Sequence, residues 1–401
     1  MSLAILLSWS LVLMWLTYYQ SVVTVMFFVD DLSVLMICLT MMVGVMIFCV
    51  SKSGANLKLS FYSVIISILF FSSSSWLMMF IWFELSLIPV TLIVVVGGAY
   101  PERVAAAMYM FMFTFIPSSP LLMMILSMEV DGDQFIYETN IKSMSQILMM
   151  SVAFLAKVPL FFLHPWLPKA HVEAPLEGSM LLAGLMLKFG AYGLIRVWSA
   201  FSETWLSLIY VMGMFGSVMS LLVAISSDDM KMSVALSSVS HMNLCLANLA
   251  TITQMSVEAG GIILVTHGLT SPLLFVVVTS VYMMVGTRSV LVSKGTCSGF
   301  NLTSSLVWVG WIHNISIPPM YSFTGELMEM STILSVSWIS WAIMGIYLTL
   351  TSVFSFINLG MLTHSPWKGD VKLGYSWNPV SVLSVVVTLI LVLSFVFDGI
   401  K

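Results

Sequence analysis

Apolar runs long enough to cross a membrane recur along nearly the whole chain, and short polar stretches separate them. A hydrocarbon core of ~30 Å requires about 20 apolar residues in an α-helix. Because backbone groups in lipid must bond internally, and the alternating pattern of a β-barrel is absent, the runs are predicted to be helices. The pattern predicts about 13 spans, at residues 2–19, 32–50, 59–71, 75–97, 103–127, 146–163, 176–198, 204–225, 231–250, 257–284, 303–334, 338–361 and 378–398.

Prolines and glycines interrupt two of these runs. The first interruption extends from Lys157 through several prolines to Pro175, and the second is "HNISIPPMYSFTGEL" at 313–327. A pair of broken spans, one in each half of a chain, is typical of transporters built from structural repeats with sites near the membrane midplane. We therefore expect one transmembrane domain over 1–401, with repeat regions at 59–198 and 204–361 and a terminal helix at 378–398.

The composition agrees with an all-α polytopic membrane protein, because 60% of the 401 residues are hydrophobic and only 8% are charged. The net charge of −4 includes no basic stretch, so no nucleic-acid partner is expected. The four cysteines lie far apart without a C-x-x-C motif, which argues against an iron–sulfur cluster or another metal site. No glycine-rich loop has the spacing that binds a dinucleotide, so no cofactor is predicted in this chain.

Several ionisable side chains nevertheless lie within the apolar runs, at a cost of about 2.5–3.5 kcal/mol for each charged one. They are Glu84, Lys157, Lys188, His241, His267 and Glu326. Each has a structural alternative: a lysine can extend to the headgroups, a buried histidine often satisfies a carbonyl, and Glu326 can lie at a helix end. Together, however, they favour a proton path, because a glutamate and a lysine in a dry interior change protonation when a nearby charge moves.

The first broken segment carries four more polar side chains: His164, Lys169, His171 and Glu173. We expect them to form a polar loop that supports the proton path. The alternative is a hydrated loop without a functional role.

Several motifs resemble one known family closely. They include "FELSLIP" at 83–89, "LAKVPLFFLHPWLPKAHVEAPLEGSMLLAGLMLKFGAYGLIR" at 155–196 and "NISIPPMYSFTGEL" at 314–327. These segments are similar to the signature of subunit 4 of mitochondrial NADH:ubiquinone oxidoreductase, respiratory complex I. The resemblance implies an antiporter-like subunit of the membrane arm, with two inverted five-helix repeats that each contain a broken helix.

Carried over by motif, the resemblance also assigns roles to the residues singled out above. It implies that Glu84 pairs with Lys157, that Lys188 is the central lysine, and that Glu326 leads to the far exit. His241 and His267 would continue the polar axis between the last two.

The function implied is proton translocation across the mitochondrial inner membrane, coupled to NADH oxidation and ubiquinone reduction elsewhere in the complex. NAD, FMN and iron–sulfur clusters are then expected in other subunits, and the partners are neighbouring antiporter-like subunits and phospholipids. The 34 methionines favour encoding by a mitochondrial genome. The alternative is a stand-alone cation/proton antiporter driven by an ion gradient. A haem-binding electron carrier is disfavoured because the histidines lack paired helical spacing.

Overall fold

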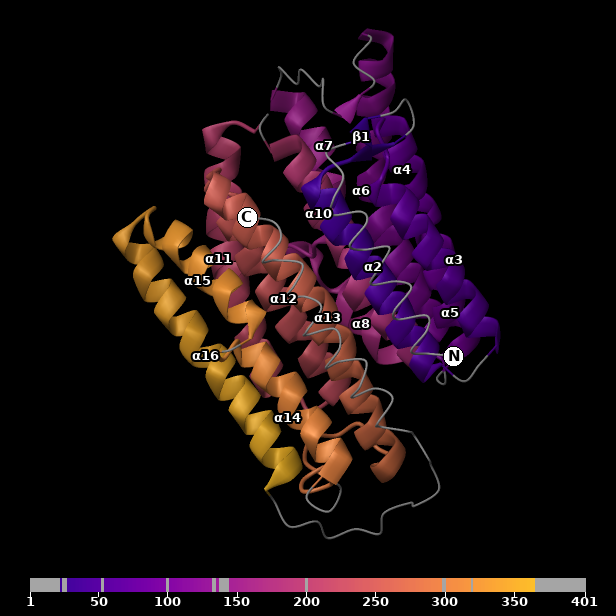
Figure 1. Cartoon of the computed structure of the whole chain (residues 1–401), viewed down its shortest axis with the longest axis vertical. Coiled ribbons are helices and arrows are strands. Elements are labelled where there is room, and N and C mark those ends of the chain that lie inside the picture. The colour runs from indigo at the N-terminus through magenta and orange to yellow at the C-terminus, as the bar shows by residue number, and fades with distance from the viewer. Residues whose placement is uncertain are drawn as a thin grey trace.

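The computed structural model describes residues 22–23, 27–51, 54–98, 101–131, 135–136, 144–198, 201–297, 301–318 and 320–364. Its helices form one elongated bundle in which the long helices lie roughly along a common direction (Figure 1). Eight helical segments in the described residues are long and apolar enough to cross a membrane. The prediction of a helical polytopic membrane protein is thereby confirmed.

The helices begin and end close to the predicted bounds. In chain order they are α2 (Asp31–Val50), α3 (Gly54–Phe71), α4 (Trp76–Leu85), α5 (Leu87–Gly97), α6 (Arg103–Asp131), α7 (Met144–Lys157), α8 (Trp166–Glu173), α9 (Leu176–Leu181), α10 (Leu187–Val197), α11 (Glu203–Ser226), α12 (Met230–Leu249), α13 (Gln254–Val285), α14 (Asn301–Ile315), α15 (Tyr321–Leu334) and α16 (Trp338–Thr363). The predicted spans 2–19 and 378–398 lie outside the described residues.

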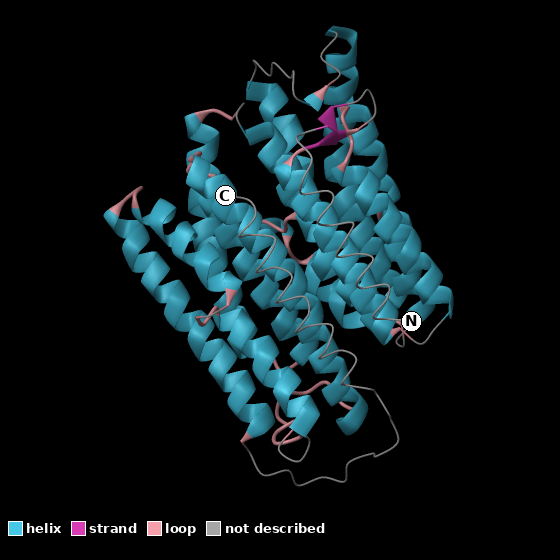
Figure 2. Ribbon diagram, in the orientation of Figure 1, coloured by secondary structure: helices cyan, strands magenta, loops and turns pink. Residues whose placement is uncertain are grey.

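A minimal β-ribbon lies at one end of the bundle. Strands β1 (Val22–Val23) and β2 (Phe28–Val29) pair antiparallel, with Val22 opposite Val29. Figure 2 shows that helices make up almost all of the remaining drawn structure. The ribbon leads directly into α2 and leaves the fold class unchanged.

Both predicted interruptions are present as broken helices. After α7 the chain turns through the 3-10 helix Phe161–Leu163 before α8, and residues 316–320 separate α14 from α15. Proline lacks the amide hydrogen and clashes with the preceding turn, so a helix cannot continue through such stretches. Figure 2 shows the resulting loops within the bundle as well as at its ends. The predicted span 75–97 is also divided, at Ser86, into α4 and α5.

The central helices are buried, whereas the outer ones expose apolar side chains. Almost every residue of α12 is buried, and α12 packs against α8, α11 and α13. In contrast, α3 exposes Phe61 and α16 exposes Trp338, which is 80% exposed. A helix buried on all sides belongs to the interior of a bundle, and exposed apolar faces on outer helices are suited to lipid.

An ion pair fastens the start of α2 to the end of α10. The two Nη atoms of Arg196 each lie 2.6 Å from an oxygen of Asp30, and Nη2 also donates to the hydroxyl of Tyr192 at 2.7 Å. The Tyr192 hydroxyl in turn donates to the carbonyl of Phe71. Bidentate pairing of this kind defines geometry as well as adding energy, so these contacts hold α10 in place.

Candidate functional site

Lys188 is completely buried, and a local change in helix geometry provides its first partner. Residues Leu182–Met186 form a π-helical turn immediately before α10. The Nζ of Lys188 donates to the carbonyl of Ala183 at 2.6 Å and lies 2.9 Å from Nδ1 of His267 on α13. Lys188 is 0% exposed. Since π-turns are frequent at functional sites, this geometry agrees with a role for the lysine beyond packing.

A glycine on α13 makes room for the lysine. A Cβ at Gly268 would lie 3.1 Å from the Cε of Lys188 and 2.7 Å from a methyl carbon of Leu39. Both distances are shorter than ordinary van der Waals contact. In the sequence "HGL", His267 is the hydrogen-bond partner of Lys188. The next residue, Gly268, has no side chain and so leaves space for the lysine.

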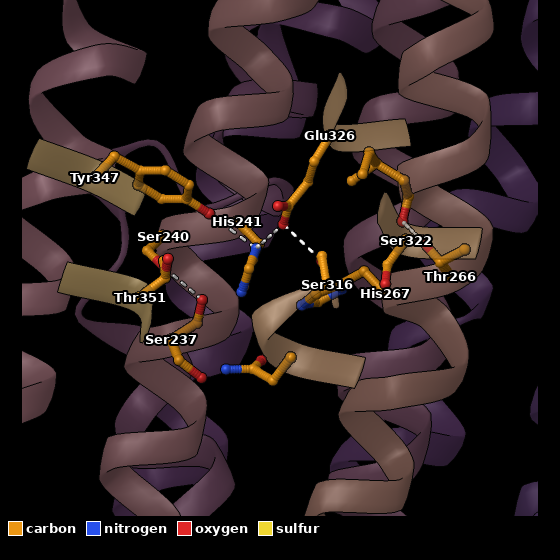
Figure 3. Close-up of polar contacts among 12 residues, drawn as sticks. Ser237, Ser240, His241, Thr266, His267, Ser316, Ser322, Glu326, Tyr347 and Thr351 are labelled. Atoms are coloured by element: carbon orange, nitrogen blue, oxygen red, sulfur yellow. Dashed lines mark hydrogen bonds and ion pairs between the residues drawn. The ribbon is translucent and has the colours of Figure 1, made fainter. Parts of the chain in front are cut away.

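His241 and Glu326 form the second part of the site (Figure 3). The Nδ1 of His241 lies 2.9 Å from the Tyr347 hydroxyl and 3.9 Å from Oε1 of Glu326. The Ser316 hydroxyl, from the break between α14 and α15, donates to the same carboxylate oxygen at 2.8 Å. Figure 3 shows the Glu326 side chain directed toward both His241 and Ser316. The broken helix thus supplies a hydrogen bond to a carboxyl group that is otherwise buried.

The two parts are adjacent. The ring centroids of His241 and His267 are 5.9 Å apart, on the neighbouring helices α12 and α13. Four of the predicted residues, Lys188, His267, His241 and Glu326, therefore form one continuous buried row. The structure thus brings these four residues together, and their roles in proton transfer stay predictions.

Lys157 and Glu84 form a separate cluster beside this row. Lys157 is 1% exposed, and its Nζ donates to the carbonyl of Phe83 at 2.9 Å and lies 3.2 Å from the Phe83 ring centroid. The charges of Glu84 and Lys157 interact electrostatically. The two side chains nevertheless form no ion pair within 4.0 Å in the described structure. The Lys157 ammonium also lies 5.3 Å from the ring of Phe189, the residue after Lys188.

The prediction of a polar loop at 164–173 is wrong for most of its residues. Lys169, His171 and Glu173 belong to the helix α8, because Pro165 and Pro168 occupy the start of that helix, where a missing amide hydrogen is tolerated. His171 is buried and its ring stacks on Phe275.

The other members of this group lie apart from the row. Lys169 is exposed and its Nζ lies 3.9 Å from the ring centroid of Tyr109, and His164 stacks on Phe161. Glu173 is an electrostatic neighbour of Arg288 and Lys231. His171 also interacts electrostatically with Lys188.

Two residues of the site were missed at the sequence level. Tyr347 lies in the apolar span α16 and Ser316 in the second break. A hydroxyl costs less than a charge inside a membrane helix, so neither residue stands out from its neighbours by energy alone. The described residues contain no group of three metal-ligating side chains.

Comparison with known proteins identifies the family. The sequence model described as "NADH:quinone oxidoreductase/Mrp antiporter, TM" matches residues 73–355. NADH-ubiquinone oxidoreductase chain 4 of Rhipicephalus sanguineus is 36% identical over 355 residues, which cover 83% of this chain and 80% of the relative. The chain belongs to the chain 4 family of NADH-ubiquinone oxidoreductase. The Ceratitis capitata member is 34% identical over 73% of this chain and 68% of its own length.

Solved structures show the same fold for this chain 4 family member. A chain of respiratory complex I from Thermus thermophilus with bound NADH matches with a TM-score of 0.85 at 20% identity, covering 96% of this chain and 88% of that one. A chain of the archaeal membrane-bound sulfane sulfur reductase, a respiratory membrane complex, also has a TM-score of 0.85, at 17% identity, covering 98% and 87%. The predicted antiporter-like fold is confirmed, whereas the repeat boundaries 59–198 and 204–361 stay predictions.

Proposed function

We propose that this chain translocates protons as an antiporter-like membrane-arm subunit of respiratory complex I, the proton-translocating NADH:ubiquinone reductase. Family membership and the buried row Lys188–His267–His241–Glu326 support the proposal. NADH oxidation and ubiquinone reduction belong to other subunits, which carry the FMN and iron–sulfur clusters. The partners are the neighbouring membrane-arm subunits and phospholipids, and the location is the mitochondrial inner membrane, with the chain encoded in the mitochondrial genome.

The contact between Lys188 and His267 is the observation that carries the proposal. At 2.9 Å, a proton can pass from the Lys188 ammonium to Nδ1 of His267 without a large movement of either side chain. The carbonyl of Ala183 holds Lys188 in this position whether the amine is charged or neutral. Proton transfer from the buried Lys188 amine to the hydrogen-bonded imidazole of His267 is therefore the first step.

The following steps use the histidines and Glu326. The 5.9 Å between the ring centroids means that transfer from His267 to His241 requires a bridging water molecule or a ring rotation. From His241, the proton moves to Glu326, whose Oε1 is 3.9 Å from Nδ1. Ser316 donates to that oxygen and so favours the ionised carboxylate that receives the proton.

Lys157 and Glu84 supply the electrostatic control. A charge on Lys157 contacts the Phe83 carbonyl and ring directly, and Glu84 acts on it electrostatically. A movement of α4 toward or away from Lys157 would strengthen or weaken the electrostatic interaction between Glu84 and Lys157. Either change alters the field at Lys188, which favours or disfavours its ammonium form.

The test replaces Lys188 by methionine in the assembled complex and measures two activities. Lys188→Met is expected to abolish NADH oxidation coupled to proton pumping, while NADH oxidation with an artificial acceptor continues. Lys58→Met, at an exposed position of α3, is the matched control. Normal proton pumping in Lys188→Met would refute the proposal, and sodium-dependent transport by the chain purified alone would support the stand-alone antiporter instead.

A further inference from the structure

Glu329 is a buried acid that the steps above do not use. It lies on α15 and is 1% exposed. Neither of its carboxyl oxygens has a hydrogen-bond partner within the described structure. An unpartnered carboxylate at such a position carries a large desolvation cost, which the group avoids by holding a proton. Glu329 is therefore suited to bind and release a proton.

Most of the buried residues of α15 are polar. Ser322, Glu326, Glu329 and Thr332 are buried, whereas Leu327 on the opposite side is 46% exposed. Residues three or four positions apart share one face of a helix. This arrangement is suited to a helix in a membrane, because its acidic side chains point into the bundle, where other polar groups can pair with them.

A matching polar stripe on α12 faces it. His241, Cys245 and Asn248 are four and then three residues apart, so they also share one face. His241 lies opposite Glu326 at 3.9 Å, and the Cys245 thiol is an electrostatic neighbour of the Glu329 carboxyl. At the third level, Thr332 donates to the Asn248 side-chain oxygen at 2.5 Å. The two helices thus form a ladder of three polar pairs.

The ladder leads from the centre of the bundle to one end of it. Each step of three residues advances about 4.5 Å along α15, from the break before Tyr321 toward the end of the helix at Leu334. Asn248 lies at the end of α12 and also donates to the carbonyl of Ser256, at the start of α13. Beyond it, Ile252 and Thr253 in the turn between these helices are exposed.

We propose that Glu329 is the proton acceptor that follows Glu326, and that the ladder between α12 and α15 is the exit track. The O–H bond of the Glu326 carboxylic acid breaks, its electron pair stays on Glu326, and the proton forms an O–H bond on the Glu329 carboxylate. Release toward the turn between α12 and α13 then passes the hydroxyl and amide of the third pair. This inference rests on the proposed function, because it extends the same proton path.

The experiment compares Glu329→Gln with Glu258→Gln in the assembled complex incorporated into vesicles. Glu258 is the control because it is exposed on α13 and hydrogen-bonds only to Gln254 in the described structure. Glu329→Gln is expected to lower NADH-driven proton uptake by about a hundredfold or more, and Glu258→Gln to leave it unchanged. In infrared difference spectra on NADH addition, a carboxyl C=O band should disappear in the Glu329→Gln complex alone.

Wild-type proton uptake and an unchanged infrared spectrum in Glu329→Gln would overturn the inference. If Lys188→Met abolishes uptake in the same preparation, the proposed function stands and only the role of Glu329 fails; if Lys188→Met pumps normally, both fail. If Glu329→Gln prevents assembly of the complex, proton uptake is measured in the Glu329→Asp variant instead. It keeps the carboxyl group one methylene farther back, so slowed uptake supports the inference and wild-type uptake contradicts it.

Discussion

The close approach of α10 to α7 at Gly193 allows a quantitative prediction. A Cβ on Gly193 would lie 2.2 Å from Cε1 of Phe154, about 1.2 Å inside ordinary van der Waals contact. Phe154 is buried and packs edge-on against Phe83, with ring centroids 5.6 Å apart. Because the Phe83 ring also lies 3.2 Å from the Lys157 ammonium, Phe154 cannot move without displacing the surroundings of that lysine.

The expected cost of Gly193→Ala follows from two opposing effects. Overpacking a filled interior costs about 1–3 kcal/mol, and the better helix propensity of alanine offsets about 1 kcal/mol. The free energy of unfolding should therefore fall by up to about 2 kcal/mol. The effect on turnover should be larger, because a displacement of about 1 Å at a reacting group can lower a rate by a hundredfold.

Thermal unfolding of the solubilised complex and NADH-driven proton uptake test this prediction. Gly345→Ala on α16 is the matched control, because a Cβ there has no atom within 4 Å. The control should keep normal proton uptake and gain about 0.4–1 kcal/mol in stability. A Gly193→Ala complex that unfolds at or above the wild-type temperature and pumps protons normally would show that the contact with Phe154 does not constrain α10.

Two further predictions concern the ion pair of Asp30 with Arg196 and the hydroxyl of Tyr347. Burial raises the pKa of Asp30, but the hydrogen bonds and charge of Arg196 outweigh this effect and hold the pKa below its usual value of 3.8. The stability contributed by this pair is thus complete above pH 3.8 and is lost as the pH falls through the lowered pKa. Asp30→Asn should lower the unfolding temperature near neutral pH and flatten its decline in acid; an unchanged acid profile would contradict this. Tyr347→Phe removes the hydroxyl that hydrogen-bonds to His241, and it should slow coupled proton uptake without reducing assembly. Uptake at the wild-type rate would argue against a role for that hydroxyl.

The helices and the central row were predictable because both follow from the energetics of a bilayer. Apolar length predicts spans, proline predicts breaks, and the cost of an intramembrane charge singles out Lys188 and Glu326. These rules act on single residues and on neighbours in the chain. They therefore locate both ends of α13 and the end of α15 within a few residues.

Which side chains pair with each other was harder to predict from the sequence, because the pairs depend on contacts between distant segments. Glu84 and Lys157 were expected to associate, yet the break at Ser86 offers Lys157 the carbonyl of Phe83 at closer range. Glu329 lies three residues after Glu326 in the sequence, but the polar stripe of α12 that faces it depends on how α12 packs on α15. The roles assigned to the individual site residues stay predictions.

The π-turn at Leu182–Met186 has a consequence for how α9 and α10 relate to each other. A residue added to one turn rotates everything after it by about 100° relative to everything before it. The two segments therefore continue along one path while their faces are out of phase. The number of residues in this single turn therefore determines the direction in which Lys188 points. With an ordinary α-helical turn at this position, the lysine would face another helix.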